Sequence, residues 1–231
     1  MVMNSMLKNF FFIKLLRKSA RILGYKIDFL PLTLIDTIES KIEYVTRLSR
    51  RAQNIPGAVV ECGLGNGVSF AILAKDAYVA SKDLYGFDSF EGFPEPVKED
   101  DSHYEIKKGG WGNAEQKAVE QKVKDVVSAE YFEKHVKITP GFFSDTLPKT
   151  ETGPISFLHL DGDLYQSYMD CYENLYEKVV PGGIILIDEY LNGTEYAKYP
   201  GGFKAASVFF AGKEVDVCRD MKSGKYYIVK R

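Results

Sequence analysis

The sequence predicts an α/β protein with a mostly parallel sheet that is covered by helices on both faces. Short, almost continuously apolar runs alternate along the chain with segments of helical periodicity, a pattern typical of strands buried on both sides. A glycine-rich turn joins the first run to the helix after it, and several later runs end in acidic residues. Because ligands bind at the carboxyl ends of parallel strands, these features also predict where the site lies.

Composition narrows the class of protein. The 231 residues are 45% apolar and 27% charged, which suits one globular domain with a full core. The formal net charge of −2 argues against a nucleic-acid partner. The three cysteines are scattered, so we expect neither a disulfide framework nor a Cys-x-x-Cys metal site. Scattered cysteines fit a reducing compartment and predict a cytoplasmic location.

Two helical segments precede the first predicted strand. Residues 1–55 hold 10 Lys/Arg and 4 Asp/Glu, and residues 8–23 form an amphipathic pattern with one basic face. The favoured interpretation is a lid or dimerisation helix, and the alternative is peripheral contact with the anionic inner surface of a membrane. We predict an N-terminal helical segment over 1–55, a cofactor-binding domain over 56–231, and a homo-oligomer.

The first predicted strand, 58–62, leads into the glycine-rich turn. Glycine lets the backbone turn sharply and lets a ligand approach closely, and the next helix presents free backbone N–H groups to that ligand. The second strand, 84–87, is followed by Asp88, where a carboxylate can accept hydrogen bonds from a ribose. A nucleoside-containing cofactor is therefore expected. The turn's glycines are Gly63, Gly65 and Gly67.

The spacing of these glycines separates two kinds of cofactor. G-x-G-x-G departs from the G-x-G-x-x-G fingerprint of nicotinamide enzymes. With Glu61 before it and Ser69 after it, the turn resembles motif I of S-adenosylmethionine-dependent methyltransferases. In that alignment the hydroxyl and N–H of Ser69 lie in the first helical turn, near the methionine carboxylate. A nicotinamide-dependent sugar oxidoreductase is kept as the alternative.

The rest of the chain continues the alternation of strands and helices. A long polar stretch, 89–112, contains the single tryptophan, Trp111, and loops of this length are usually functional. Ser167 and Asp170 have the spacing of a helix cap. The other expected elements are a helix over 113–134, strands over 136–139, 155–160 and 184–187, and closing strands over 214–218 and 226–230.

Acidic residues follow two neighbouring predicted strands: Asp161 follows one, and Asp188 and Glu189 follow the other. Three carboxylates close together raise one another's pKa, and a divalent cation would remove that conflict. Oxygen ligands favour magnesium, manganese or calcium over zinc. The simpler alternative is that these acids cap helices and contact water. His159, on the same strand as Asp161, is interpreted as a hydrogen-bonded core residue.

Five segments together resemble the macrocin O-methyltransferase family: 61–67, 88–94, 140–148, 158–165 and 181–190. The resemblance covers roughly residues 40–212. It implies a class I methyltransferase Rossmann-like fold with a mostly parallel seven-stranded sheet, bound S-adenosylmethionine and magnesium (Mg2+). Glu189 stands where the family usually has Asp, and the basic N-terminal helix lies outside the match.

The resemblance also implies roles for individual residues. It places the metal on Asp161, Asp188 and Glu189, and the catalytic base on Asp161. It implies a magnesium-assisted O-methyltransferase acting on a sugar hydroxyl of a glycan or glycosylated natural product, so the partner is a small-molecule or glycan acceptor. A catalytically inactive membrane-associated binding protein with this fold is the remaining alternative. The expected cofactor-binding residues are Glu61, Gly63, Ser69, Asp88, Ser89 and Phe142, and the aromatic candidates to stack on the sugar are Trp111, Tyr165 and Tyr190.

Overall fold

The computed structural model describes residues 32–190 and 198–231, with side chains from Lys41 onward. Lys41–Arg231 form one compact unit, and Met1–Ser40 belong to a separate one. The predicted amphipathic helix over 8–23 lies outside the described residues. The division at residue 55 stays a prediction.

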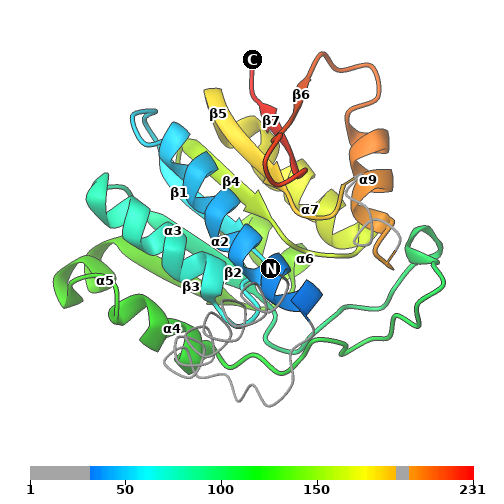
Figure 1. Cartoon of the computed structure of the whole chain (residues 1–231), viewed down its shortest axis with the longest axis horizontal. Helices are drawn as coiled ribbons and strands as arrows, with labels where there is room; N and C mark the ends of the chain where they lie inside the picture. Colours follow the sequence, from blue (N-terminus) through cyan, green and yellow to red (C-terminus); the bar gives the residue numbers. More distant parts are fainter. Residues whose placement is uncertain (1–31, 191–197) are drawn as a thin grey trace, which may run out of the picture. The chain divides into compact units, whose positions relative to one another are not determined.

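The compact unit is built on one seven-stranded sheet (Figure 1). The strand order is β3-β2-β1-β4-β5-β7-β6; pairs from β3 to β5 are parallel, and β7 runs antiparallel to β5 and β6. The predicted α/β fold with a mostly parallel sheet is confirmed. The strands are β1 Ala58–Cys62, β2 Leu84–Asp88, β3 Val136–Pro140, β4 Ile155–Leu160, β5 Val179–Ile187, β6 Asp216–Arg219 and β7 Tyr226–Val229.

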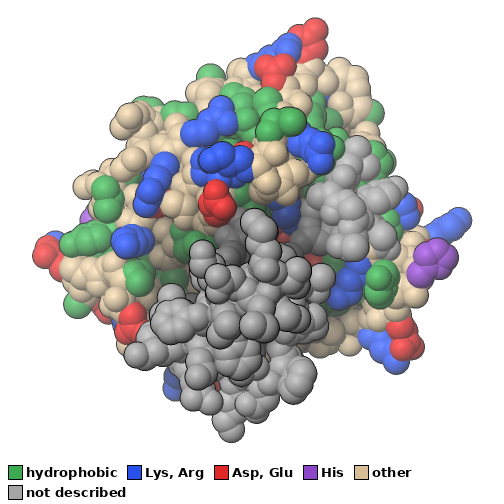
Figure 2. Space-filling model, in the orientation of Figure 1, with side chains coloured by type: hydrophobic (Ala, Val, Ile, Leu, Met, Phe, Trp, Pro, Cys, Tyr) green, Lys and Arg blue, Asp and Glu red, His purple; other side chains and the backbone are tan. Residues whose placement is uncertain are grey.

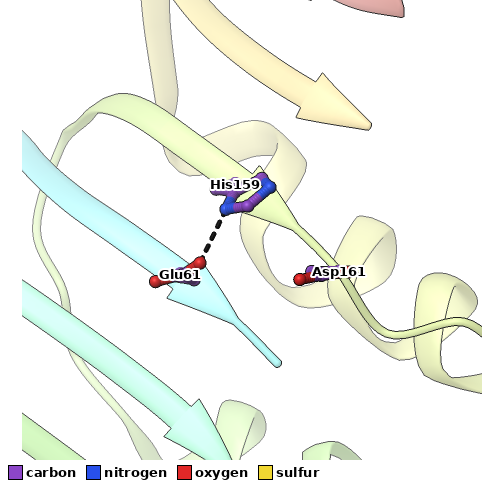
Figure 3. Close-up of side chains that lie close together, drawn as sticks. All are labelled: Glu61, His159 and Asp161. Carbon is purple, nitrogen blue, oxygen red and sulfur yellow. Dashed lines mark hydrogen bonds and ion pairs between the residues drawn. The ribbon is translucent and has the colours of Figure 1, made fainter. Parts of the chain in front are cut away.

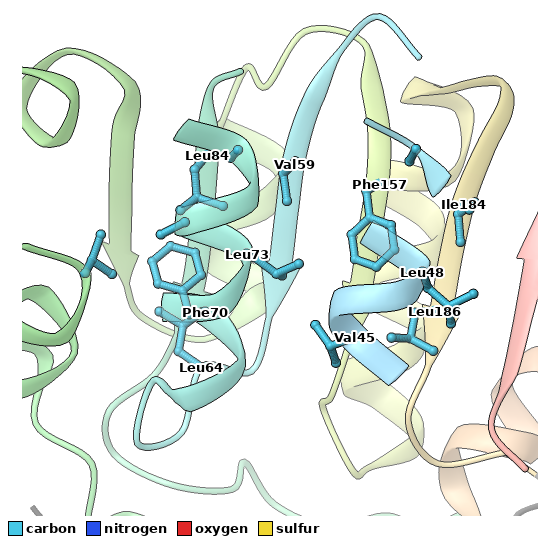
Figure 4. Packing of buried hydrophobic residues seen from close by; sticks show 14 of the residues in the cluster. Val45, Leu48, Val59, Leu64, Phe70, Leu73, Leu84, Phe157, Ile184 and Leu186 are labelled. Carbon is cyan, nitrogen blue, oxygen red and sulfur yellow. The ribbon is translucent and has the colours of Figure 1, made fainter. Parts of the chain in front are cut away.

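Helices cover both faces of the sheet, and the alternation of side chains along each strand divides the core in two. Val59 points into a cluster shared with α2, α3 and α4, whereas its neighbour Val60 points into a cluster shared with α7 and α9. Figure 4 shows the first cluster, where Val45 and Leu48 of α2 lie beside Phe157 of β4. The helices are α2 Leu32–Arg51, α3 Val68–Val79, α4 Gln116–Lys124, α5 Ala129–His135, α6 Phe143–Thr146, α7 Tyr165–Leu175 and α9 Gly201–Phe209, with 3-10 turns at Lys98–Asp100, Leu147–Lys149 and Tyr176–Lys178.

Three local predictions were wrong. The single helix expected over 113–134 is divided into α4 and α5, because the Ser128 hydroxyl caps a new helix by accepting a hydrogen bond from the Tyr131 N–H at 3.2 Å. Ser167 is not a cap but lies inside α7, whose Tyr165 N–H donates to the distant, buried Asp100 at 2.7 Å. Strand β5 begins at Val179 rather than 184, because Gly182 and Gly183 pair with the backbone of Lys230.

An ion pair fastens α2 to the turn between β6 and β7. Arg47 contacts both carboxylate oxygens of Asp220, with a distance of 3.2 Å between Nε and Oδ1. Burial opposes ionisation, but hydrogen bonds from Arg47 and Ser223 lower the pKa of Asp220 to about 2. Other basic side chains, including Arg50 and Arg51, also lie on α2, and Figure 2 shows Lys and Arg side chains gathered over this helix.

None of the helices in 32–190 and 198–231 has the length and apolar character needed to cross a bilayer.

Replacing Arg47 with Met is expected to lower the free energy of unfolding by about 1–2 kcal/mol at neutral pH, since each pKa unit corresponds to about 1.4 kcal/mol. The carboxyl of Asp220 has a folded pKa below its ordinary value of 3.8, so its contribution to stability is present above that value and is lost as pH falls towards about 2. Urea denaturation of wild type and variant between neutral and acid pH measures the difference. Arg47→Lys, which keeps the charge without the two-point contact, should give an intermediate loss. A difference that stays constant down to about pH 2 would contradict the assignment.

Candidate active site

The carboxyl ends of the central strands are joined by backbone hydrogen bonds that continue beyond the strands. The N–H of Gly63 donates to the Phe87 carbonyl at 2.8 Å, and that of Asp161 donates to Cys62 at 2.9 Å. The N–H of Asp188 donates to Leu160, also at 2.9 Å. The glycine turn and the acidic residues therefore lie at the same edge of the sheet, as predicted.

The glycine turn requires glycine for steric reasons at its first position. Gly63 has φ of +92°, and a Cβ there would lie 1.9 Å from the carbonyl oxygen of Asp161. Gly67, with φ of +79°, is the residue before α3 and has no side chain to cap the helix; the N–H of Val68 donates to Asn66 Oδ1 at 3.3 Å. The amino end of α3 thus suits an anionic group, such as the carboxylate of a methionine moiety.

Asp88 holds the glycine turn in place. Its Oδ2 accepts hydrogen bonds from the N–H groups of Leu64 at 2.8 Å and Gly65 at 2.9 Å, while its Oδ1 accepts one from Phe90 at 2.8 Å. Carboxylate oxygens have further acceptor capacity, so these bonds are compatible with the predicted contact to a ribose. Asp88 therefore has a structural role that the sequence did not indicate.

The other predicted cofactor residues lie at the ends of the first three strands. Ser69 is buried in the first turn of α3. The Ser89 hydroxyl, just after β2, donates to the Gly92 carbonyl at 2.8 Å. Phe142 is half-buried between β3 and α6. Their contact with a cofactor stays a prediction.

Glu61 and His159 form a buried pair across β1 and β4 (Figure 3). Both are fully buried, and Glu61 Oε1 lies 2.7 Å from His159 Nδ1. His159 is thus a hydrogen-bonded core residue, as interpreted from the sequence. Within the described part of the chain, Glu61 Oε2 and His159 Nε2 have no hydrogen-bond partner. The cofactor role of Glu61 stays a prediction, and Asp161 lies just past the end of the same strand as His159.

The three candidate metal ligands converge. One ligand oxygen each from Asp161, Asp188 and Glu189 lies within 4.8 Å of the others, which brings the carboxylates close enough to share a cation. Asp188 and Glu189 are buried, and the Asp161 side chain is 19% exposed. Their predicted role as metal ligands remains to be tested.

Three side chains that sequence reasoning missed also contact these acids. The Lys41 Nζ of α2 lies 2.6 Å from Asp161 Oδ2 and 3.4 Å from Asp188 Oδ2. The Tyr44 hydroxyl donates to Asp188 Oδ1, and Lys225 Nζ is 3.1 Å from the same oxygen. The sequence offered one clue to these contacts: Lys41 is a lysine on the inward-facing stripe of α2, one turn before the buried Tyr44 and Val45.

These contacts set different protonation states within one cluster. Burial raises the pKa of Asp188, but Lys225 and Lys41 outweigh it and hold that pKa well below its usual range. Burial lowers the pKa of Lys41, but the charges of Asp161 and Asp188 outweigh it and raise that pKa well above normal. Lys41 is therefore an ammonium ion and no general base. Burial raises the pKa of Asp161, which suits a proton acceptor.

Glu189 is held from a different side than Asp188. Its Oε2 lies 2.7 Å from the hydroxyl of Tyr168 on α7 and 3.2 Å from the N–H of Asp163. Burial and the nearby Asp163 raise the pKa of Glu189 well above its usual range. Asp163 has a left-handed backbone, with φ of +57°, in the turn that follows Asp161. The longer side chain of glutamate is thus fixed by two hydrogen bonds.

The predicted aromatic residues have different surroundings. Trp111 is 68% exposed, and its indole N–H donates to the Tyr199 hydroxyl at 2.7 Å. Lys198 Nζ lies 5.2 Å from the centroid of the Trp111 ring. Tyr190 packs on Phe203 instead, with ring centroids 5.1 Å apart. Of these two, Trp111 is the one whose ring is largely open to a ligand.

Comparison with known proteins agrees with this geometry. The calicheamicin methyltransferase CalS11 superimposes with a TM-score of 0.73 at 18% identity, covering 92% of this chain and 90% of that one. A 4'-O-methyltransferase of Streptomyces olivaceus that acts on a rhamnosyl-tetracenomycin is 35% identical over 146 residues, which are 60% of this chain and 55% of that protein. The demethyldecarbamoylnovobiocin O-methyltransferase of Streptomyces niveus is 32% identical over 145 residues, covering 60% and 54%.

The fold is that of the class I S-adenosylmethionine-dependent O-methyltransferases. Residues 34–211 match the family described as Macrocin-O-methyltransferase (TylF), and the chain belongs to that family. The predicted resemblance is confirmed. In each alignment the matched segment spans little more than half the length of these curated relatives.

Replacing Gly63 with Ala is expected to displace the turn, because the added Cβ would overlap the Asp161 carbonyl. We expect a loss of several kcal/mol of stability, in the range of severe backbone and packing defects, together with loss of cofactor binding. Gly153→Ala is the matched control: Gly153 has φ of +65°, but no atom lies within 4 Å of its Cβ position. Thermal denaturation and calorimetric titration with S-adenosylhomocysteine measure both effects. Equal losses in the two variants would show that backbone strain, not the overlap, is responsible.

Proposed function

We propose that this protein is an S-adenosylmethionine-dependent O-methyltransferase that methylates a sugar hydroxyl of a glycan or glycosylated natural product. The observation that carries the proposal is that the Asp88-bound glycine turn and the acids after β4 and β5 lie at one edge of the sheet. Membership of the macrocin O-methyltransferase family supports it and argues against the nicotinamide alternative. A relative named for methylation of a rhamnosyl group supports the sugar acceptor.

The residues around the glycine turn would hold the cofactor. Asp88 would accept hydrogen bonds from the ribose, Ser69 and the amino end of α3 would receive the methionine carboxylate, and Phe142 would line the adenine pocket. When bound, S-adenosylmethionine supplies an electrophilic methyl group. The protein's part is mainly to hold the acceptor oxygen in line with that group.

The acid cluster fits a magnesium ion. Asp161, Asp188 and Glu189 offer only oxygen ligands, and their oxygens converge. When bound, magnesium would lower the pKa of an acceptor hydroxyl. Asp188 is suited to metal binding because its neighbours keep it ionised. Glu189 carries one more methylene than the usual aspartate and is held by Tyr168 and the Asp163 N–H.

The carboxylate of Asp161 would take the proton from the acceptor hydroxyl. Of the three acids, Asp161 is the most exposed to solvent, and burial raises its pKa. Asp188 is a poor candidate because its pKa is held low by two lysines. Trp111, with its open ring, would contact the acceptor sugar.

The proposal also keeps a cytoplasmic location and a homo-oligomer, with residues 8–23 as a lid or dimerisation helix; the alternative for these residues is peripheral contact with an anionic membrane. Flotation with anionic vesicles tests the last of these. If a chain lacking residues 1–30 floats as well as the full chain, that contact does not occur.

Replacing Asp161 with Asn is expected to lower kcat by at least about 100-fold, since a general base contributes about 10²–10⁴-fold. Affinity for S-adenosylhomocysteine should stay within about threefold of wild type, because Asp161 lies outside the predicted cofactor contacts. Asp145→Asn, at an exposed acid on α6, removes the same charge and should leave both values unchanged. Single-turnover kinetics and calorimetry provide the measurements. An Asp161→Asn enzyme that keeps a tenth of wild-type kcat would contradict the role.

The function itself is tested by methyl transfer from labelled S-adenosylmethionine to a panel of sugar nucleotides, glycosides and glycan fragments, with magnesium or with a chelator. We expect transfer to a sugar hydroxyl in the magnesium samples and a strong reduction with chelator. Calorimetric binding of NAD instead of S-adenosylmethionine would overturn the assignment.

A further inference from the structure

The ammonium group of Lys41 lies between the two carboxylates that would hold a divalent cation. Its Nζ is 2.6 Å from Asp161 Oδ2 and 3.4 Å from Asp188 Oδ2. A magnesium ion bound to those oxygens would lie about 2.0–2.1 Å from each. The ammonium and a divalent cation would therefore compete for the same oxygens.

The other oxygen of Asp188 is held from the opposite side. Oδ1 accepts a hydrogen bond from the Tyr44 hydroxyl and pairs with Lys225 Nζ at 3.1 Å. Lys41 contacts the second oxygen, Oδ2. A metal bound to the Oδ2 atoms of Asp161 and Asp188 would use the oxygens that Lys41 contacts.

The Lys41 side chain can move away from the two carboxylates while its helix stays folded. The next turn of α2 is anchored in the core by Tyr44, Val45 and Leu48, which are almost completely buried. The Lys41 side chain itself is 30% exposed, and a lysine has a flexible four-carbon stem. Movement of that stem alone would take the ammonium group away from both carboxylates.

We propose that Lys41 is a built-in counter-ion that occupies the acid cluster until a divalent cation displaces it, and so sets the affinity of the site for metal. In the metal-free protein its positive charge compensates carboxylates that would otherwise repel each other while partly buried. This proposal adopts from the proposed function only the identity of the metal ligands. Its test measures metal binding and needs neither cofactor nor acceptor, so its outcome does not depend on whether methyl transfer is found.

The first experiment titrates Mn2+ into the full chain and follows free Mn2+ by electron paramagnetic resonance. Lys41→Met removes the competing charge and keeps a side chain of similar length, so its Kd for Mn2+ should be at least tenfold lower than that of wild type. Lys41→Arg keeps the charge and should stay within threefold. Lys204→Met is the control for net charge, because Lys204 donates to the Glu99 carbonyl rather than to these acids, and it should stay within twofold.

An unchanged or weaker affinity in Lys41→Met would overturn the proposal; the weaker result would mean that Lys41 organises the acids for the metal. Failure of Mn2+ to bind either wild type or Lys41→Met would overturn it too. A second measurement uses wild type only and so does not depend on how a variant folds. Brief acetylation followed by mass spectrometry should show Lys41 modified at least threefold faster in saturating Mn2+, with Lys204 unchanged. An unchanged rate at Lys41 would also overturn the proposal.

Discussion

The backbone hydrogen bonds between the parallel strands do not stop where the strands end. They continue through Gly63, Asp161 and Asp188, each of which donates to the neighbouring strand. Because this ladder fixes the positions of the residues that follow β1, β4 and β5, the glycine turn and the acids are placed by the sheet rather than by flexible loops. Placement by a rigid element is what a site for in-line transfer requires. The same constraint explains why Gly63 has no room for a side chain.

Buried carboxylates that lie close together repel one another, and side chains from other elements compensate their charge. Lys41 and Tyr44 of α2 and Lys225 before β7 all contact this cluster. The pKa values of the three acids therefore differ: Asp188 is kept ionised, whereas burial raises the pKa of Asp161 and of Glu189. Helix α2 is thus part of the site, although it precedes all the strands of the sheet in the chain. Its attachment to Asp220 through Arg47 helps to keep it there.

Much of the fold could be predicted because it depends on local patterns. The apolar runs of β1 and β4 are buried at every position, and glycine and acidic residues follow the strands as expected. What could not be predicted depends on residues distant in sequence. The first N–H of α7 donates to Asp100, and the counter-ions of Asp161 and Asp188 come from α2 and from the turn before β7. No spacing rule connects Lys41 with Asp161, and the one clue was a lysine on an inward-facing helical stripe.

The central claim is that the acids after β4 and β5 are compensated either by Lys41 or by a divalent cation, but not by both at once. It is tested most directly by a crystal structure of the protein soaked with Mn2+, in which anomalous scattering locates the metal. We expect an anomalous peak in contact with Asp161 and Asp188, and Lys41 Nζ more than 4 Å from either carboxylate. A peak at these acids with Lys41 still bridging them, or no peak at these acids at saturating Mn2+, would contradict it.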